Sequence, residues 1–167
     1  MNMEIERKYL VKVIPFGLEE YEKHEIEQGY LGTDPVVRIR KSDDRHILTI
    51  KSGGLLMRHE FEKDITLEEY AELSKMVRGN IISKTRYKIP YDIYTIELDI
   101  FHKAFDGLIY AEVEFKDVES AKSFKAPDYF LKEVTEDASY QNSSLSEMNP
   151  SDIESFITSA YLLSSTT

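Results

Sequence analysis

Charged side chains recur at every second position in several stretches of this sequence. Glu4, Glu6 and Lys8 are spaced in this way, and so are Arg38 and Arg40. Residues i and i+2 of an extended strand project from the same face, so each group would place its charges side by side. The same spacing joins Thr49 with Lys51, Glu60 with Glu62, Lys84 with Arg86 and Lys88, Glu97 with Asp99, and Glu112 with Glu114.

Such groups could hold a metal ion and a phosphate in one place. Carboxylates that are crowded together repel one another, and a cation that joins them relieves the repulsion. Oxygen-only ligand sets suit Mg²⁺ or Mn²⁺, which bind through a few carboxylates together with substrate phosphates. Arginine binds phosphate oxygens bidentately, and lysine binds them as a point charge. The residue types therefore fit transfer of a phosphoryl group to water, in which positioning and electrostatic stabilisation supply most of the acceleration.

Other catalytic chemistries fit the sequence poorly. The absence of cysteine excludes thiol nucleophiles, thiolate metal sites and disulfides. The four histidines, at positions 24, 46, 59 and 102, lack a metal-ligand spacing such as HExxH and are interpreted as surface or capping residues. There is no Walker-type loop and no GxGxxG motif, and Ser52-Gly53-Gly54 is interpreted as a hairpin turn.

The chain has 167 residues and a formal net charge of −10. This length suits one domain with a substantial core, which we place at residues 1–167. An acidic chain repels nucleic acid and anionic membranes, so neither is an expected partner. A phosphate ligand would therefore need a local cluster of basic residues or a bridging cation.

Nothing in the sequence predicts a membrane or secreted protein. No apolar run reaches the roughly 20 residues that a transmembrane helix needs. The start, MNMEIERKYLV, has carboxylates where a signal peptide would have a basic region followed by an apolar one. We therefore expect a cytoplasmic location.

Period-two alternation of apolar and polar residues dominates the chain and predicts strands. Turn signals such as Ser42-Asp43-Asp44 and Asp106-Gly107 separate several of them, and short connections favour antiparallel pairing. The expected strands cover residues 3–10, 25–31, 36–41, 47–51, 57–63, 81–90, 94–101 and 108–116.

Helices are expected at only a few places between the strands. Thr66 and Glu69 form a capping box for a helix that would carry Val77 on its apolar face and stop at residues 78–79. Asn149-Pro150 would open a C-terminal helix over about residues 150–163. Shorter helices or turns are expected over residues 117–123 and 18–23.

These elements predict a mainly β (α+β) fold, a closed eight-stranded antiparallel β-barrel with two to four peripheral helices. Closure removes exposed strand edges, and the interior of such a barrel holds side chains or one small ligand. The alternative is an open sheet whose charged face lies in water. Composition alone produces many like-charged pairs, but here each pair lies in a strand whose alternate face is apolar, and this position favours the barrel.

The segment Glu4-Ile5-Glu6-Arg7-Lys8 resembles the ExExK signature of the CYTH superfamily, the triphosphate tunnel metalloenzymes. Further segments resemble the family in the same order along nearly the whole chain. They lie at residues 28–31, 37–40, 48–51, 60–62, 84–87, 97–99, 112–114, 133–135 and 140–142.

The resemblance implies an eight-stranded antiparallel tunnel that binds a triphosphate and needs a divalent cation. The implied main metal ligands are Glu4, Glu6 and Glu114, with Glu112, Asp99 and Glu97 supporting a second metal or orienting water. The implied phosphate-binding residues are Lys8, Arg38, Arg40, Lys51, Lys84 and Arg86. Catalysis would rest most directly on Glu4, Glu6, Lys8, Arg40, Arg86 and Glu114. Glu60 and Glu62 match family positions but either could pair with a base, and Tyr140 and Asn142 would be structural.

The chain departs from the family pattern near its C-terminal end. The family commonly has glycine before the Glu-Val-Thr segment and a basic residue before its tyrosine. Leu131 and Ser139 stand at those positions here. Lys132 is a candidate for the phosphate contact that the missing basic residue would make.

Within the family, the chain resembles the bacterial inorganic triphosphatases. This implies hydrolysis of tripolyphosphate to diphosphate and phosphate with Mg²⁺ or Mn²⁺. The enzyme alternatives are a class IV-type adenylate cyclase and a nucleoside or thiamine triphosphatase. A non-catalytic polyphosphate or nucleotide sensor is the alternative of another class. The sequence leaves open whether the chain acts as a monomer or a homodimer.

Overall fold

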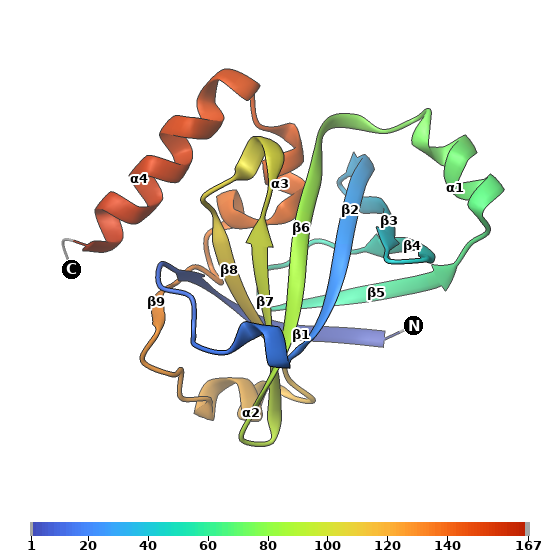
Figure 1. The fold of residues 1–167 in the computed structure, drawn as a ribbon. Coiled ribbons are helices and arrows are strands. Elements are labelled where there is room, and N and C mark those ends of the chain that lie inside the picture. Colours follow the sequence, from blue (N-terminus) through green and yellow to red (C-terminus); the bar gives the residue numbers. More distant parts are fainter. Residues whose placement is uncertain (1, 166–167) are drawn as a thin grey trace.

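A single antiparallel sheet wraps around a central space in the computed structural model, which describes residues 2–165 (Figure 1). Its strands are β1 (Asn2–Val11), β2 (Glu22–Thr33), β3 (Val36–Ser42), β4 (Arg45–Lys51), β5 (Met57–Asp64), β6 (Arg78–Tyr91), β7 (Tyr94–Phe101), β8 (Ile109–Glu114) and β9 (Phe130–Glu133). The helices are α1 (Leu67–Ser74), α2 (Val118–Ser123), α3 (Asn142–Glu147) and α4 (Ile153–Ser165). Four short 3-10 turns are η1 (Leu18–Glu20), η2 (Lys103–Phe105), η3 (Ala138–Tyr140) and η4 (Pro150–Asp152).

The first strand closes the sheet into a barrel. The strand order is β5-β4-β3-β2-β6-β7-β8-β1-β9, and β1 also pairs with β5. Residues 2–5 of β1 lie against β5, with Glu4 opposite Arg58, whereas residues 9–11 lie against β9. One long strand therefore serves both partners, and the eight strands β1–β8 form the closed barrel that the alternation predicts. The open-sheet alternative is wrong.

All eight predicted strands are present, but the helix predictions are only partly correct. The Thr66–Glu69 capping box is confirmed, because Glu69 N donates to Thr66 Oγ1 at 3.0 Å and Thr66 N donates to Glu69 Oε1 at 2.9 Å. The helix ends at Ser74, however, and residues 78–79 begin β6 instead of stopping the helix. Pairing of Arg78 with Tyr30 in the long β2–β6 ladder extends the strand over them. Similarly, β2 starts at Glu22, so only η1 remains of the turn expected over residues 18–23.

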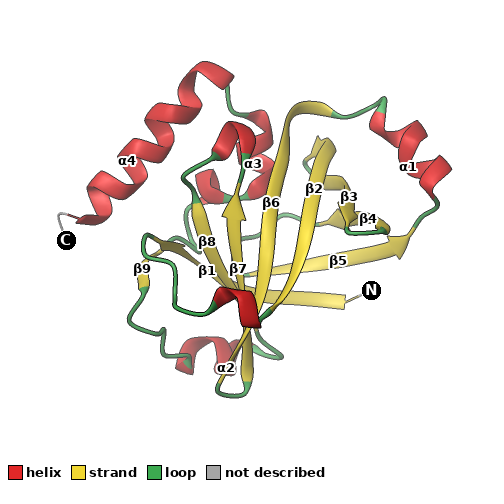
Figure 2. Cartoon of the chain, viewed as in Figure 1, coloured by secondary structure: helices red, strands yellow, loops and turns green. Residues whose placement is uncertain are grey.

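The helices lie outside the barrel (Figure 2). Helix α2 is the one expected over residues 117–123, and Asp117 caps it by accepting from Ser120 N at 2.7 Å. Strand β9 and helix α3 were not predicted. Within the described part of the chain, no helix has the length and hydrophobicity to cross a membrane.

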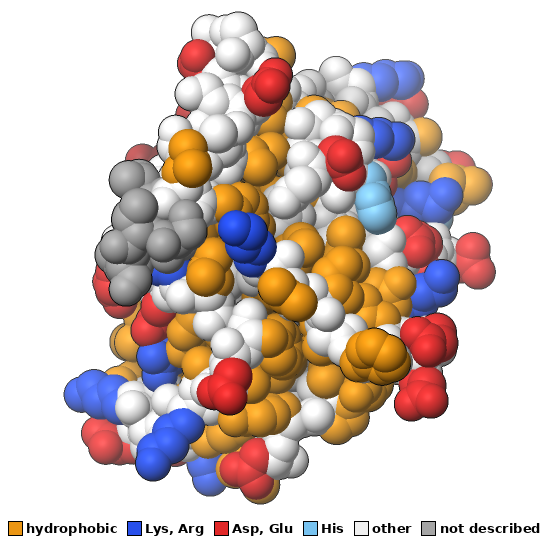
Figure 3. Space-filling view, turned by 60° about the vertical axis from the view of Figure 1, so that its left-hand side comes forward, with side chains coloured by type: hydrophobic (Ala, Val, Ile, Leu, Met, Phe, Trp, Pro, Cys, Tyr) orange, Lys and Arg blue, Asp and Glu red, His pale blue; other side chains and the backbone are white. Residues whose placement is uncertain are grey.

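Two hydrophobic clusters hold the barrel. One lies on its outer wall under α2 and includes Val113, Phe115 and Phe124. Hydrophobic side chains accordingly gather on the face seen in Figure 3, and charged ones lie mostly around its margin. The charged members of the alternating strands are therefore left to face inwards.

The second cluster closes one end of the barrel interior. The inward-facing rows of charge give way to apolar residues at this end, and α3 and α4 pack over them. Leu10, for example, follows Glu4, Glu6 and Lys8 on the same face of β1. The corresponding residues on the other strands are Tyr30, Val36, Ile82, Phe101 and Tyr110. The barrel interior is thus lined by charged residues and closed at one end by this apolar cluster.

Gly79 sets how closely α3 can approach β6. Its φ is +71°, and a Cβ atom at this position would collide with the carbonyl oxygen of Ser146 in α3. We predict that Gly79→Ala lowers the free energy of unfolding by roughly 1–3 kcal/mol, through backbone strain and displacement of α3. Urea titration measures this. Gly53→Ala is the matched control, since nothing lies within 4 Å of its added Cβ. Equal stability of the two variants would contradict the prediction.

Candidate active site

The barrel encloses a cavity of about 550 Å³ to which all eight of its strands contribute side chains. Most residues predicted from the sequence line it: Glu4, Glu6, Lys8, Arg38, Arg40, Lys51, Glu60, Glu62, Lys84, Arg86, Glu97, Glu112 and Glu114. Two do not. Asp99 lies in the wall behind the cavity surface, and Lys132 is exposed on β9, so neither can contact a ligand in the cavity as the structure stands.

Carboxylates face one another across neighbouring strands on one side of the cavity. Glu6 is opposite Glu114 in the β1–β8 ladder, and Glu97 is opposite Glu112 in the β7–β8 ladder. Like charges placed directly across a sheet are destabilising. Burial, followed by the charges of Glu112 and Glu4, raises the pKa of Glu6 to about 8. Among the described residues Glu6 forms no ion pair, and the positive charges of Lys51 and Lys8 offset the rise in its pKa only in part.

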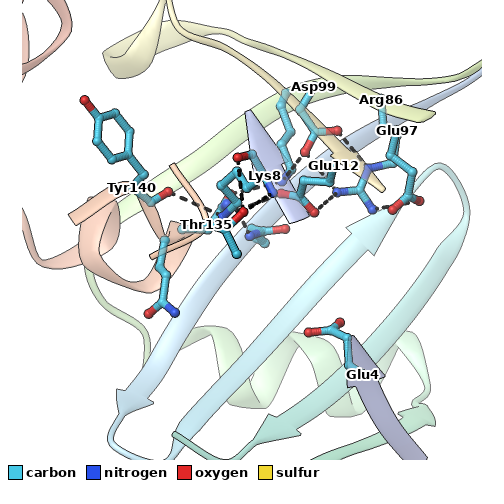
Figure 4. Close-up of polar contacts among 12 residues, drawn as sticks. Glu4, Lys8, Arg86, Glu97, Asp99, Glu112, Thr135 and Tyr140 are labelled. Carbon is cyan, nitrogen blue, oxygen red and sulfur yellow. Dashed lines mark hydrogen bonds and ion pairs between the residues drawn. The ribbon is translucent and has the colours of Figure 1, made fainter. Parts of the chain in front are cut away.

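Glu4 is paired with two basic groups. Lys51 Nζ lies 2.8 and 3.1 Å from its carboxylate oxygens, and an Arg58 nitrogen lies 3.4 Å away. Burial alone would raise the pKa of Glu4, but the Lys51 ammonium outweighs it and lowers that pKa to about 2. Figure 4 shows Glu4 across the cavity from Lys8, Glu112 and Asp99.

The acid cluster fits a hard divalent cation by its chemistry. Its donors are carboxylate oxygens, which suit Mg²⁺ or Mn²⁺, and a bound cation would counteract the burial and the neighbouring acids that raise the pKa of Glu6. Within residues 2–165, however, no three His, Asp or Glu side chains converge as a ready-made metal site. Glu4 is turned towards Lys51 and Arg58 instead. The donors are therefore present, but their side chains would have to move to surround an ion.

Two arginines on β3 carry the opposite charge without an acidic partner. Among the described residues, neither Arg38 nor Arg40 forms an ion pair; Arg38 donates to Thr49 Oγ1 at 3.0 Å and Arg40 to Gln28 Oε1 at 2.8 Å. The Nε of Arg38 is buried without a hydrogen-bond partner. Burial, together with the neighbouring Arg38 and Arg86, lowers the pKa of Arg40 to about 9. This side of the cavity is an incomplete anion site.

Asp99 holds two further basic groups in place. It is fully buried and accepts both Nε and a terminal nitrogen of Arg86, at 2.8 and 2.9 Å, while Lys84 Nζ lies 2.8 Å from its Oδ2. Bidentate pairs of this kind fix the arginine geometrically. This arrangement does not test the prediction that Asp99 supports a metal ion, but it suits a residue that positions Arg86 and Lys84.

Several lining residues were not predicted. Arg58 shares the period-two spacing of Glu60, which is the signal that could have revealed it. Asn142 belongs to the segment 140–142 that resembles the family, but it was expected to be structural, whereas it lines the cavity. His24 is not a simple surface residue, because it lines the cavity and its Nδ1 lies 2.7 Å from Asp43 Oδ2.

Comparison with known proteins gives consistent relatives. Residues 2–148 match the CYTH domain family. An inorganic triphosphatase of Nitrosomonas europaea is 39% identical over 147 residues, covering 85% of this chain and 95% of the relative. An inorganic triphosphatase of Acetivibrio thermocellus is 35% identical over 154 residues, covering 87% and 94%. The crystal structure of the inorganic triphosphatase NE1496 superposes with a TM-score of 0.67 at 34% identity, covering 90% of this chain and 98% of that one.

The two kinds of basic residue should respond oppositely to removal of their charge. We predict that Arg86→Met lowers the free energy of unfolding by roughly 3 kcal/mol, because it breaks a buried pair and leaves Asp99 under-compensated. Arg38→Met should leave that free energy unchanged or raise it, because it removes a buried charge that has no acidic partner. Urea unfolding in a buffer without multivalent anions or metals compares them. A loss of stability in Arg38→Met as large as that in Arg86→Met would refute the uncompensated-charge description.

Proposed function

This chain belongs to the CYTH domain family, and we propose that it hydrolyses inorganic triphosphate to diphosphate and phosphate with a divalent cation. The observation that carries the proposal is the pair of uncompensated charge sets in one cavity. Among the described residues, Arg38 and Arg40 form no ion pair with a carboxylate. Glu6 lies opposite Glu114 and forms no ion pair with a basic residue. A polyanion together with a cation would satisfy both sets. The two relatives named inorganic triphosphatase support this choice.

The composition of the cavity wall supports a substrate that is phosphate throughout. Basic residues that could contact its oxygens are Lys8, Arg38, Arg40, Lys51, Lys84 and Arg86. Tyr30 is the one phenylalanine, tyrosine or tryptophan among the lining residues, so the described cavity offers little for stacking a nucleobase. In the proposed reaction a water oxygen attacks the terminal phosphorus, the bridging P–O bond breaks, and diphosphate leaves. The basic residues hold the three phosphates in line and neutralise the charge that develops on their oxygens.

We propose Mg²⁺ or Mn²⁺ as the cation, with Glu6, Glu112 and Glu114 as its ligands and Glu4 as a further one. All four line the cavity. A cation would relieve the crowding that raises the pKa of Glu6 and of Glu114, whereas Glu4 and Glu112 would exchange part of their contact with basic residues for the ion. When bound, such a cation would neutralise charge on the phosphate oxygens. Glu97 would orient water or support a second ion, and Glu60 and Glu62 remain candidates for pairing with basic groups such as Lys51, which lies 3.4 Å from Glu60.

Substrate choice is tested with purified protein and three compounds. We predict that phosphate is released fastest from tripolyphosphate, more slowly from ATP and thiamine triphosphate, and from none of them after chelation of divalent cations. Phosphate release and cyclic AMP formation are both measured. Faster release from a nucleoside triphosphate would overturn the substrate assignment, and cyclic AMP would indicate a cyclase. Binding without any turnover would indicate a sensor.

The acid cluster is tested by an isosteric change. We predict that Glu6→Gln lowers kcat/KM for tripolyphosphate at least about tenfold and weakens Mn²⁺ binding, because it removes one ligand from the cluster. Glu68→Gln is the matched control, since Glu68 is exposed on α1 outside the cavity. Calorimetric titration of Mn²⁺ accompanies the kinetics. Wild-type turnover in Glu6→Gln would exclude the assigned role.

A further inference from the structure

Neutral oxygen atoms hold several cations of the cavity. Lys84 Nζ donates to Asn142 Oδ1 at 3.0 Å, Arg40 Nε donates to Gln28 Oε1 at 2.8 Å, and Lys8 Nζ donates to the Tyr140 carbonyl oxygen at 3.4 Å. Arg86 is held instead by the carboxylates of Asp99 and Glu97, and Lys84 Nζ also lies 2.8 Å from Asp99 Oδ2. Asp99 thus carries one negative charge for two cations, and Asn142 adds none. A carboxylate partner cancels the charge of the group that it holds, whereas an amide or a carbonyl does not.

The two amides are joined to each other. Gln28 Nε2 donates to Asn142 Oδ1 at 3.3 Å and to the Tyr30 hydroxyl at 2.9 Å. One oxygen of Asn142 therefore serves Lys84 directly and Arg40 through Gln28. Lysine and arginine can only donate hydrogen bonds, so the amide oxygens have to face them. This requirement fixes the orientation of both amide side chains.

The C-terminal segment brings Asn142 to this position rigidly. Asn80 Nδ2 on β6 donates to the carbonyl oxygens of Leu145 and Met148, at 2.9 and 2.7 Å, and so ties α3 to the barrel. Gln28 is almost fully buried, with 1% of its surface exposed. A buried, doubly bonded amide pair has a single arrangement available to it. The cations that it holds are therefore pre-oriented before any ligand arrives.

We propose that Asn142 and Gln28 are positioning residues that hold Lys84 and Arg40 for a phosphate oxyanion while adding no negative charge to the basic side of the cavity. The identity of that oxyanion as triphosphate rests on the proposed function. The essential property of both residues is that they are neutral acceptors. A carboxylate of the same shape would hold the cations at least as firmly, yet it would remove the charge that attracts the ligand.

Isosteric acids separate this role from a structural one. Asn142→Asp and Gln28→Glu keep an acceptor oxygen in place and add one negative charge. We expect Asn142→Asp to keep or raise the Tm of the ligand-free protein, because a charge-assisted bond replaces a neutral one. Gln28→Glu also loses the Nε2 bonds to Asn142 Oδ1 and the Tyr30 hydroxyl, so we expect its Tm to fall. We expect both to weaken tripolyphosphate binding at least about tenfold, measured by calorimetry in EDTA so that no metal-dependent turnover occurs. The KM for hydrolysis should rise more than kcat falls.

Asn80→Asp is the control for both stability and added charge. Like the other two variants it adds one negative charge, but at a contact between β6 and α3 that lies outside the cavity. It also loses the hydrogen bonds that Asn80 donates to Leu145 and Met148. We expect it to lower the Tm and to bind tripolyphosphate within about threefold of the wild type. Asn142→Ala, which removes the acceptor without adding charge, should bind more weakly than the wild type but more tightly than Asn142→Asp.

Several outcomes would overturn the inference. They are wild-type affinity in Asn142→Asp and Gln28→Glu, a loss of affinity no larger than that of Asn80→Asp, a fall in the Tm of Asn142→Asp, or absence of oxyanion binding by the wild-type protein. A wild-type protein that binds tripolyphosphate without hydrolysing it would refute the proposed function alone. The positioning role would then still be decided by the binding series.

Discussion

Closure of the barrel forces charged strand faces to meet one another instead of water, and the arrangement of the rest of the site depends on this. Once β1 pairs with β5, the side chains that alternate with the apolar wall have only the interior to occupy. The wall satisfies some of them internally, as Asp99 does for Arg86. It leaves Glu6 facing Glu114, and Arg38 and Arg40 without an acid. The hydrophobic clusters on the outer wall and at the closed end of the barrel must offset that electrostatic cost.

The basic residues of the cavity fall into two kinds, according to whether their partner is a carboxylate or a neutral group. Carboxylate partners make Arg86 a fixed part of the wall, because the bidentate contact with Asp99 is buried and complete. Neutral partners, such as Thr49 for Arg38 and Gln28 for Arg40, fix the direction of a group and leave its charge available. Lys84 combines the two kinds, because Asp99 pairs with it and Asn142 of the C-terminal segment adds a neutral contact. An enzyme for a compact polyanion needs both rigidity and residual positive charge, and this division provides them.

Period-two alternation was sufficient to predict eight strands, their antiparallel pairing and the inward direction of most site residues. Glu112 and Arg40 were predicted in this way, because the alternation of charged and apolar residues within one strand shows which side chains share a face. The same signal did not show which charges would neutralise one another. The burial of Asp99 depends on strand register, and Asn142 reaches the cavity from a segment more than a hundred residues beyond Gln28. The four-residue β9 and the polar α3 lack any periodic pattern and are defined by the barrel against which they pack.

A crystal structure with tripolyphosphate and Mn²⁺ tests the central claim most directly, namely that the uncompensated acids and bases converge on one ligand site inside the barrel. We predict a triphosphate within the cavity, with its oxygens bonded to Arg38 and Arg40, and Mn²⁺ between those oxygens and the carboxylates of Glu6 and Glu114. A ligand bound only on the outer surface would contradict it. A triphosphate inside the barrel that leaves Arg38 and Arg40 without contact would contradict it equally.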